Sequence, residues 1–167
     1  LDNCSNQWDF WVYPALLPEP DTTGIFITRD YKQAAEQAQQ GAKVLLLADG
    51  KVEKGKEVVQ YFRPVFWNTS WFQMRPPHTL GILTHPEHPA LAAFPTEYHS
   101  NLQWWELLHN QQVMNLDDFP ADFIPIVQPI DTWFINRKLG LIFEAKLGRG
   151  CLIVCSADIS SAPDRRI

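Results

Sequence analysis

Residues 24–48 constrain the fold more than any other part of the chain, because they form two apolar runs joined by one amphipathic segment. The runs cover residues 24–28 and 43–48 and are typical of short buried strands. Between them, Asp30 can cap a helix that ends at Gly41 and that carries apolar side chains at i, i+3, i+4 and i+7. Consecutive strands joined through a helix are parallel and have a right-handed crossover. The segment therefore predicts a βαβ unit.

Weaker patterns further along the chain predict more elements. These are a helix over 54–62, a strand over 80–83, a helix over 100–109, a strand over 123–127, and a hairpin of strands 141–147 and 151–155. In the second helix we expect Leu102, Trp105 and Leu108 to face inward, with Trp104 pointing about 100° away from Trp105. Together these elements predict an α/β fold, a three-layer sandwich whose mainly parallel sheet carries an antiparallel edge hairpin.

The first twenty residues read as a separate piece. Residues 8–13 have a strand pattern, and residues 14–20 are rich in proline. A strand that ends in such a link before any pairing partner has appeared indicates the last strand of a preceding domain. We therefore divide the chain into 1–20, an end strand and linker, and 21–167, the main domain, which we expect to continue past Ile167.

Length and charge exclude several classes of protein. A chain of 167 residues can bury a core without disulfides but is too short for a (β/α)₈ barrel, which needs about 250 residues. Fourteen basic side chains against nineteen acidic ones give a net charge of −5. Nucleic acids and anionic membranes attract basic surfaces, so we expect neither as a partner.

The most distinctive local motif is His85-Pro86-Glu87. A His and a Glu two residues apart resemble the catalytic pair of class I glutamine amidotransferases. That chemistry also needs a cysteine on a glycine-flanked turn between a strand and a helix, because only an exposed thiolate is nucleophilic. The sequence has no such turn. A hydrolase that uses His85 and Glu87 is therefore an alternative, and a solvated proline-rich loop is the simpler interpretation.

The remaining ligand-type residues predict neither a metal nor a cofactor. His85 and His88 have a spacing compatible with ligation, but no cysteine pair or His-Glu-x-x-His helix accompanies them. Cys151 and Cys155 would share a face of one strand at about 13 Å, too far apart for a disulfide. We expect buried, inert thiols.

Seven tryptophans support a further hypothesis, that the chain is a carbohydrate-binding module. Aromatic rings beside amide and imidazole groups can stack on a sugar and bind its hydroxyls, although the same rings can instead pack a loop onto the sheet. The hypothesis places six side chains around a cleft at the strand ends: Trp67, Asn68, Trp71, His85, His88 and Asp131.

Several runs resemble family 2 glycoside hydrolases of the β-galactosidase type. Asn-Gln-Trp-Asp-Phe-Trp-Val-Tyr-Pro at 6–14 is similar to the closing strand of a β-sandwich domain in that family. Other runs are similar to the extra C-terminal domain of some large bacterial members, Bacteroides-type proteins among them. These runs are Phe-Trp-Asn-Thr-Ser-Trp-Phe at 66–72, His-Thr-Leu-Gly at 78–81, His-Pro-Ala-Leu at 88–91, Phe-Pro-Thr at 94–96, Gln-Trp at 103–104, Pro-Ile-Asp at 129–131 and Gly-Leu-Ile-Phe-Glu at 140–144.

This resemblance implies a flavodoxin-like or amidotransferase-like accessory domain that follows the sugar-active domains. The family's catalytic glutamates belong to a barrel domain outside this chain, so the resemblance implies no catalytic residue here. It also implies a periplasmic or secreted parent enzyme. The expected partners are the neighbouring domains of that enzyme and carbohydrate. A homo-oligomer is a further expectation, because a comparable domain in family 42 β-galactosidases serves trimer assembly.

Overall fold

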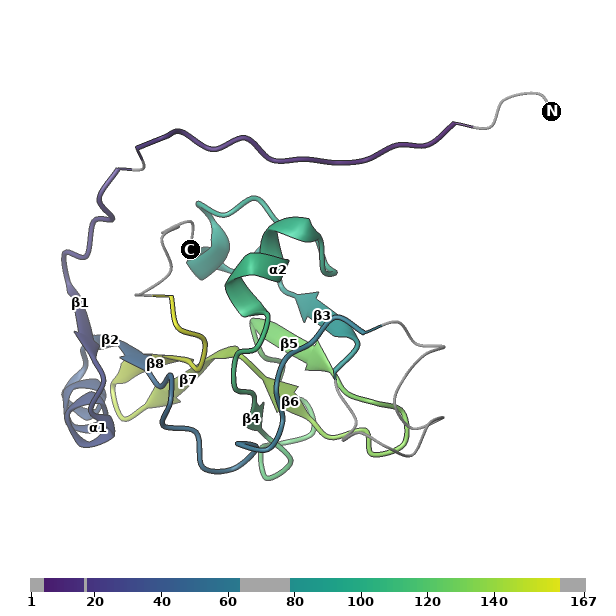
Figure 1. The fold of residues 1–167 in the computed structure, drawn as a ribbon. Coiled ribbons are helices and arrows are strands. Elements are labelled where there is room, and N and C mark those ends of the chain that lie inside the picture. Colours follow the sequence, from purple (N-terminus) through teal and green to yellow (C-terminus); the bar gives the residue numbers. More distant parts are fainter. Residues whose placement is uncertain (1–4, 17, 64–78, 160–167) are drawn as a thin grey trace.

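A computed structural model describes residues 5–16, 18–63 and 79–159 (Figure 1). Its main feature is a six-stranded sheet in the order β1-β2-β8-β7-β5-β3. The strands are β1 (Ile25–Thr28), β2 (Lys43–Leu47), β3 (Gly81–Thr84), β5 (Val127–Ile130), β7 (Ile142–Leu147) and β8 (Gly150–Cys155). Two short strands, β4 (Met114–Asn115) and β6 (Leu139–Gly140), form a second sheet. The helices are α1 (Tyr31–Gln40), α2 (Leu102–Leu108) and a short 3-10 helix, η2 (Pro89–Leu91).

The predicted βαβ unit is confirmed. Strands β1 and β2 are parallel, with Phe26 opposite Val44. The Asp30 carboxylate caps α1 by accepting hydrogen bonds from the backbone N–H groups of Lys32 and Gln33. Gly41 ends the helix at φ +108°, a left-handed conformation that favours glycine. The predicted hairpin is also confirmed as the antiparallel pair β7–β8.

The predicted fold class is wrong. Only the pairs β1–β2 and β2–β8 are parallel, whereas β8–β7, β7–β5 and β5–β3 are antiparallel. Two α-helices are present in the described part of the chain, which does not make a flavodoxin-like three-layer sandwich. The physical reason is that, within the described residues 127–155, no helix joins β5 to β7 or β7 to β8, so these strands pair antiparallel. Parallel strands need a long crossover, and α1 is the one helical crossover between neighbouring strands among the described residues.

Two of the other predicted elements differ from the structure. Residues 54–62 form no helix: residues 54–57 form a turn, and Val59 makes an isolated antiparallel bridge with Gln112. The strand expected over 123–127 begins only at Val127 as β5. In both segments long-range backbone pairing decides the conformation, which local propensity does not report.

Helix α2 buries a different face from the one predicted. Trp104 and Leu108 are fully buried, whereas Leu102 and Trp105 are exposed. The Trp104 indole N–H donates to the Thr96 hydroxyl at 2.7 Å, which satisfies its polar atom inside the core. As expected, only one of the two neighbouring tryptophans faces inward.

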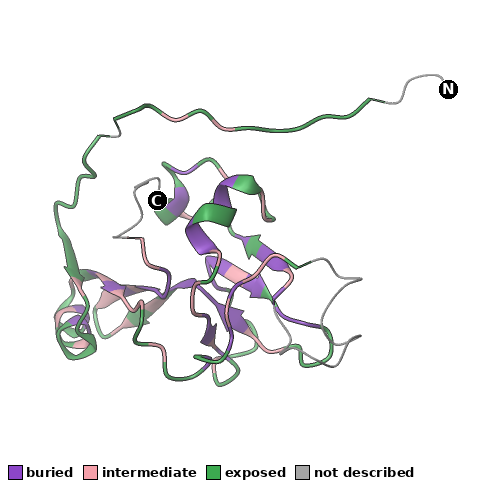
Figure 2. Ribbon diagram, in the orientation of Figure 1, coloured by how far each residue is buried: buried purple, intermediate pink, exposed green. Residues whose placement is uncertain are grey.

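The core lies on both faces of the sheet (Figure 2). On one face, α1 and the segment around β4 cover β2, β7 and β8. On the other face, α2 and η2 cover the sheet towards β5 and β3. Strands β7 and β8 contribute to both clusters, so they form the centre of the fold.

The hairpin turn is pressed against the end of α1. Gly148 has φ +62°, and a Cβ atom there would lie 2.6 Å from the Gln39 Cα. A Cβ atom at Gly150 would lie 2.3 Å from the carbonyl oxygen of Ala42. The two glycines therefore allow helix and hairpin backbones to meet without intervening side chains.

The N-terminal segment is an extended chain that passes over the α2 side of the domain (Figure 1). The strand expected over 8–13 pairs with no strand of the described residues. Trp8, Phe10 and Val12 are 77%, 80% and 85% exposed, which is unusual for side chains of this type. The Tyr13 hydroxyl donates to the Gln103 side chain and holds the segment near α2.

The close approach of turn and helix predicts that Gly148→Ala is strongly destabilising. Left-handed backbone alone costs a non-glycine residue about 1 kcal/mol, and overlap with Gln39 should raise the loss to about 3 kcal/mol in the free energy of unfolding. Gly24→Ala is the matched control, because Gly24 has φ +77° but no atom within 4 Å of the added Cβ. Urea unfolding of both variants measures the difference, and equal losses would contradict the close contact.

Candidate functional site

The histidines singled out in the sequence lie in an open groove of about 370 Å³. His85 and His88 follow β3, and Glu144 and Lys146 come from β7, with Ile124–Ile126 completing the lining. The rings of His85 and His88 are 6.2 Å apart in an edge-on arrangement. The structure therefore brings these two predicted residues together.

His88 makes a hydrogen bond with Glu144. The His88 Nδ1 atom accepts the backbone N–H of Ala90, which caps η2. This leaves the proton of the neutral ring on Nε2, which lies 2.8 Å from Glu144 Oε2 and donates to it. The ring is thereby held in one tautomer, with both nitrogen atoms engaged.

Cys151 contacts the same carboxylate. Its Sγ atom lies 2.7 Å from Glu144 Oε1 and donates its proton there. Burial, together with the adjacent negative charge, raises the pKa of the Cys151 thiol to about 11. Hydrogen bonds from Cys151 and His88 have the opposite effect on the carboxylate and lower the pKa of Glu144.

The order of these three groups determines their chemistry. In a cysteine nucleophile, an imidazole accepts the thiol proton and a carboxylate orients the imidazole. Here Glu144 lies between His88 and Cys151, so the carboxylate holds the thiol protonated. Cys155 is also unreactive, because burial raises the pKa of its thiol to about 12. Both thiols are free; Cys155 is buried as expected, whereas Cys151 is only half-buried.

The pair expected for a hydrolase, His85 and Glu87, is not hydrogen-bonded. Glu87 accepts a hydrogen bond from the Tyr98 hydroxyl at 3.1 Å. Within the described part of the chain, the His85 ring has no hydrogen-bond partner and no thiol or hydroxyl beside it to activate. His85 therefore lines the groove with no group to activate among the described residues.

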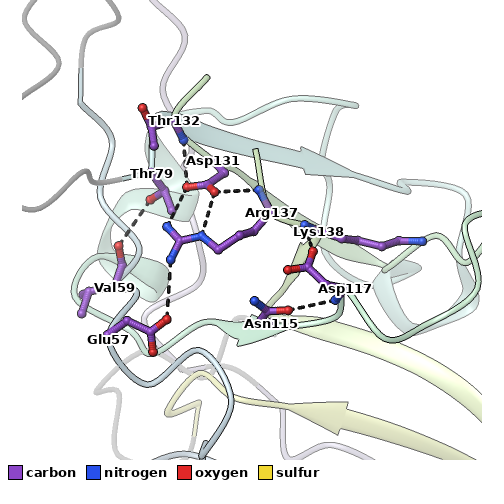
Figure 3. A network of polar contacts seen from close by, with 9 residues as sticks. All are labelled: Glu57, Val59, Thr79, Asn115, Asp117, Asp131, Thr132, Arg137 and Lys138. Carbon is purple, nitrogen blue, oxygen red and sulfur yellow. Dashed lines mark hydrogen bonds and ion pairs between the residues drawn. The ribbon is translucent and has the colours of Figure 1, made fainter. Parts of the chain in front are cut away.

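Asp131 lies elsewhere and is fully engaged (Figure 3). Its carboxylate accepts hydrogen bonds from Nε and Nη2 of Arg137, at 2.8 and 3.0 Å. It also accepts hydrogen bonds from the backbone N–H groups of Thr132 and Arg137. Burial alone would raise the pKa of Asp131, but these four hydrogen bonds outweigh it and lower the pKa. Arg137 also faces Glu57 at 3.6 Å. The group joins the end of β5 to the start of β6.

The six side chains of the carbohydrate hypothesis are thus only partly located. Trp67, Asn68 and Trp71 lie outside the described residues. Asp131 follows the end of β5 that pairs with Gly81, whereas His85 follows Thr84 at the other end of β3. The length of β3, roughly 13 Å, separates Asp131 from the two histidines. Carbohydrate binding stays a prediction.

The described residues contain no group of three or more His, Cys, Asp or Glu side chains arranged to hold a metal ion. No helix in the same part of the chain is long and apolar enough to cross a membrane.

Comparison with known families gives a match over most of the chain. A family model described as a domain of unknown function, DUF8487, matches residues 25–167. The chain belongs to the DUF8487 family. The comparison with curated proteins gives no match. The DUF8487 match begins at the first residue of β1 and leaves the extended N-terminal segment outside the family domain.

Sequence reasoning missed the contact between Glu144 and Cys151 in the DUF8487 domain. One signal was available, because the two-residue turn at 148–149 sets a register with Lys146 opposite Cys151. Glu144 is then the diagonal neighbour of Cys151 on the same face of the hairpin. The contact with His88 had no comparable signal, since it joins residues 56 positions apart.

The buried ion pair predicts that Arg137→Ala destabilises the domain by about 3 kcal/mol, because it leaves the Asp131 carboxylate without its charged partner. Lys56→Ala, which breaks an exposed pair with Glu53, should change the free energy of unfolding by less than about 0.5 kcal/mol. Chemical denaturation measures both.

The lowered pKa of Asp131 also gives this pair a pH dependence. A carboxylate whose pKa is lower in the folded state stabilises the protein above its unfolded pKa of about 3.9 and loses that contribution as the pH falls through the folded value. Wild-type stability should therefore fall below about pH 4 more steeply than that of Arg137→Ala. Parallel pH profiles would contradict the assignment.

The contact with Glu144 predicts slow alkylation of Cys151. In a Cys4→Ser background, iodoacetamide should react slowly at pH 8, and Glu144→Gln should accelerate the reaction about tenfold for each unit by which the thiol pKa falls. The control is Glu97→Gln, which removes an exposed carboxylate on another loop and should not change the alkylation rate. Rapid alkylation of the wild-type thiol at pH 7 would show that the carboxylate does not hold it protonated.

Proposed function

We propose that the chain is a non-catalytic accessory domain of a family 2-type glycoside hydrolase and that it packs against neighbouring domains of that enzyme. The observation that carries the proposal is the placement of Glu144 between His88 and Cys151. These three side chains could in another order form a cysteine nucleophile and its base, but here the carboxylate keeps the thiol protonated. Its role is therefore to stabilise the sheet face.

The N-terminal segment supports contact with another domain. Its apolar side chains at positions 8, 10 and 12 alternate along an extended backbone and are almost fully exposed. Such a pattern fits a strand that completes a sheet in a neighbouring domain and buries one apolar face there. The family domain begins only at residue 25, after this segment.

The enzyme class rests on the resemblance of the long runs at 6–14, 66–72 and 140–144 to family 2 glycoside hydrolases of the β-galactosidase type. A periplasmic or secreted location follows from the same resemblance and is part of the proposal. A carbohydrate-binding module is the second candidate. It is favoured by the half-exposed ring of Trp133 and the exposed ring of Phe134, which stand side by side at 5.4 Å.

The test uses the full-length gene product that contains this chain, assayed for hydrolysis of an aryl β-galactoside. His85→Ala with Cys151→Ala should leave kcat/KM unchanged, because neither side chain takes part in the reaction. Trp8→Lys with Phe10→Lys should lower the unfolding temperature by several degrees through loss of apolar burial against the neighbour. Tyr31→Lys, an exposed aromatic substitution on α1, is the control and should leave that temperature unchanged.

Different outcomes contradict different parts of the proposal. Absence of glycosidase activity in the full-length protein would remove the enzyme class, and loss of activity with His85→Ala would show a catalytic role. In a tryptophan-fluorescence titration of the chain with oligosaccharides, a flat response is expected. A saturable response that Trp67→Ala or Trp71→Ala abolishes would replace the accessory role with carbohydrate binding.

A further inference from the structure

A second pocket, of about 330 Å³, lies on the α1 face of the sheet, away from the histidine groove. It opens beside the carboxyl ends of β1 and β2, where α1 begins. Strand β8 is parallel to β2, so three parallel strands end on this side of the sheet. In open sheets with parallel strands, the region outside the carboxyl ends is where ligands bind.

The inner wall of this pocket is apolar and well packed from behind. Leu46, Met114, Leu116 and Phe143 line it, and each is less than a tenth exposed. The Phe119 and Phe143 rings are 5.4 Å apart in an edge-on contact and form an aromatic corner. An apolar hollow of this size exceeds the small voids of a packed core and falls in the range of small-molecule sites, roughly 300–1,000 Å³.

The rim of the pocket carries both cationic and acidic side chains. Arg29, Lys51 and Lys54 line it, against one acidic residue, Glu53. Arg29 is paired with Asp49, and Lys54 is paired with Asp118. The Lys51 ammonium group contacts the carbonyl oxygen of Arg29 and, among the described residues, has no carboxylate partner. Lys51 is therefore the rim charge best placed to attract an anion.

The loop that carries this rim is anchored on three sides. Lys51 contacts the backbone at the end of β1, and the Lys54–Asp118 pair ties it to the segment after β4. The Asn115 N–H also donates to the Lys54 carbonyl oxygen at 2.9 Å. The rim is thus held over the apolar wall, as a preformed site requires.

We propose that this pocket binds a small organic acid with an aromatic or aliphatic body. The body lies on Met114, Phe119 and Phe143, and the carboxylate group faces Lys51. An apolar wall with one charged group at the rim matches an amphiphilic anion of this kind, since the wall supplies affinity and the ammonium group orients the ligand. The site is independent of the proposed accessory function and shares no residue with the histidine groove.

The experiment titrates the chain with phenylacetate and with its neutral amide, phenylacetamide, and follows the methyl resonance of Met114 by NMR. Both probes should shift that resonance saturably, and phenylacetate should bind about two- to fivefold more tightly, as expected for one exposed charge pair. Lys51→Gln should abolish the preference for the acid. Lys56→Gln, which lies outside the pocket lining, should preserve it.

Two filling variants test the location of the site. Ala48→Phe and Val52→Trp enlarge lining residues that are only half-buried, and each should abolish the shift by both probes while leaving the unfolding temperature within a few degrees of wild type. An unshifted Met114 resonance at millimolar probe would overturn the proposal, as would binding that survives both filling variants. Equal affinity for acid and amide would overturn the assignment to an anion.

Discussion

Strand β8 is the element on which the rest of the structure depends, because it pairs in parallel with β2 on one side and antiparallel with β7 on the other. Its side chains enter both core clusters, with Leu152 and Val154 on the α1 face and Cys155 on the α2 face. The βαβ unit ends at Leu47 and the β7–β8 hairpin begins only at Ile142, and β8 joins the βαβ unit to the antiparallel half of the sheet. The hairpin turn before β8 also touches the end of α1 through Gly148 and Gly150. A break in this strand would therefore separate the two halves of the domain.

The acidic side chains of Asp131 and Glu144 make their hydrogen bonds inside the domain. The Asp131 carboxylate pairs with Arg137 and accepts hydrogen bonds from two backbone N–H groups. These contacts offset the free-energy cost of burying a carboxylate. Glu144 accepts hydrogen bonds from His88 and Cys151, and joins η2 to the hairpin. Both acids use their oxygen atoms inside the protein, which is consistent with the proposed non-catalytic role.

The surface of the domain exposes several large apolar side chains. Exposed apolar side chains lie on the N-terminal segment and on the edge strand β1, in which Ile25 and Ile27 are each 43% exposed. Edge strands of monomeric proteins usually carry charge, a bulge or proline to prevent pairing, and β1 carries none of these. This edge and the N-terminal segment are consistent with a domain that is covered by neighbours, whereas the pocket at the carboxyl ends is built from the domain alone.

The sequence by itself determined the elements whose signals are local. The cap at Asp30, the stop at Gly41 and the apolar spacing between them specify α1, and a helix between two apolar strands leaves only parallel pairing. The two-residue turn at 148–149 likewise specifies the β7–β8 register. Only the tertiary structure decided that β8 lies beside β2, that β5 and β3 extend the sheet in antiparallel order, and that His88 meets Glu144. These contacts join distant residues whose pairing depends on loop closure and on the shared core, and no spacing in the sequence records them.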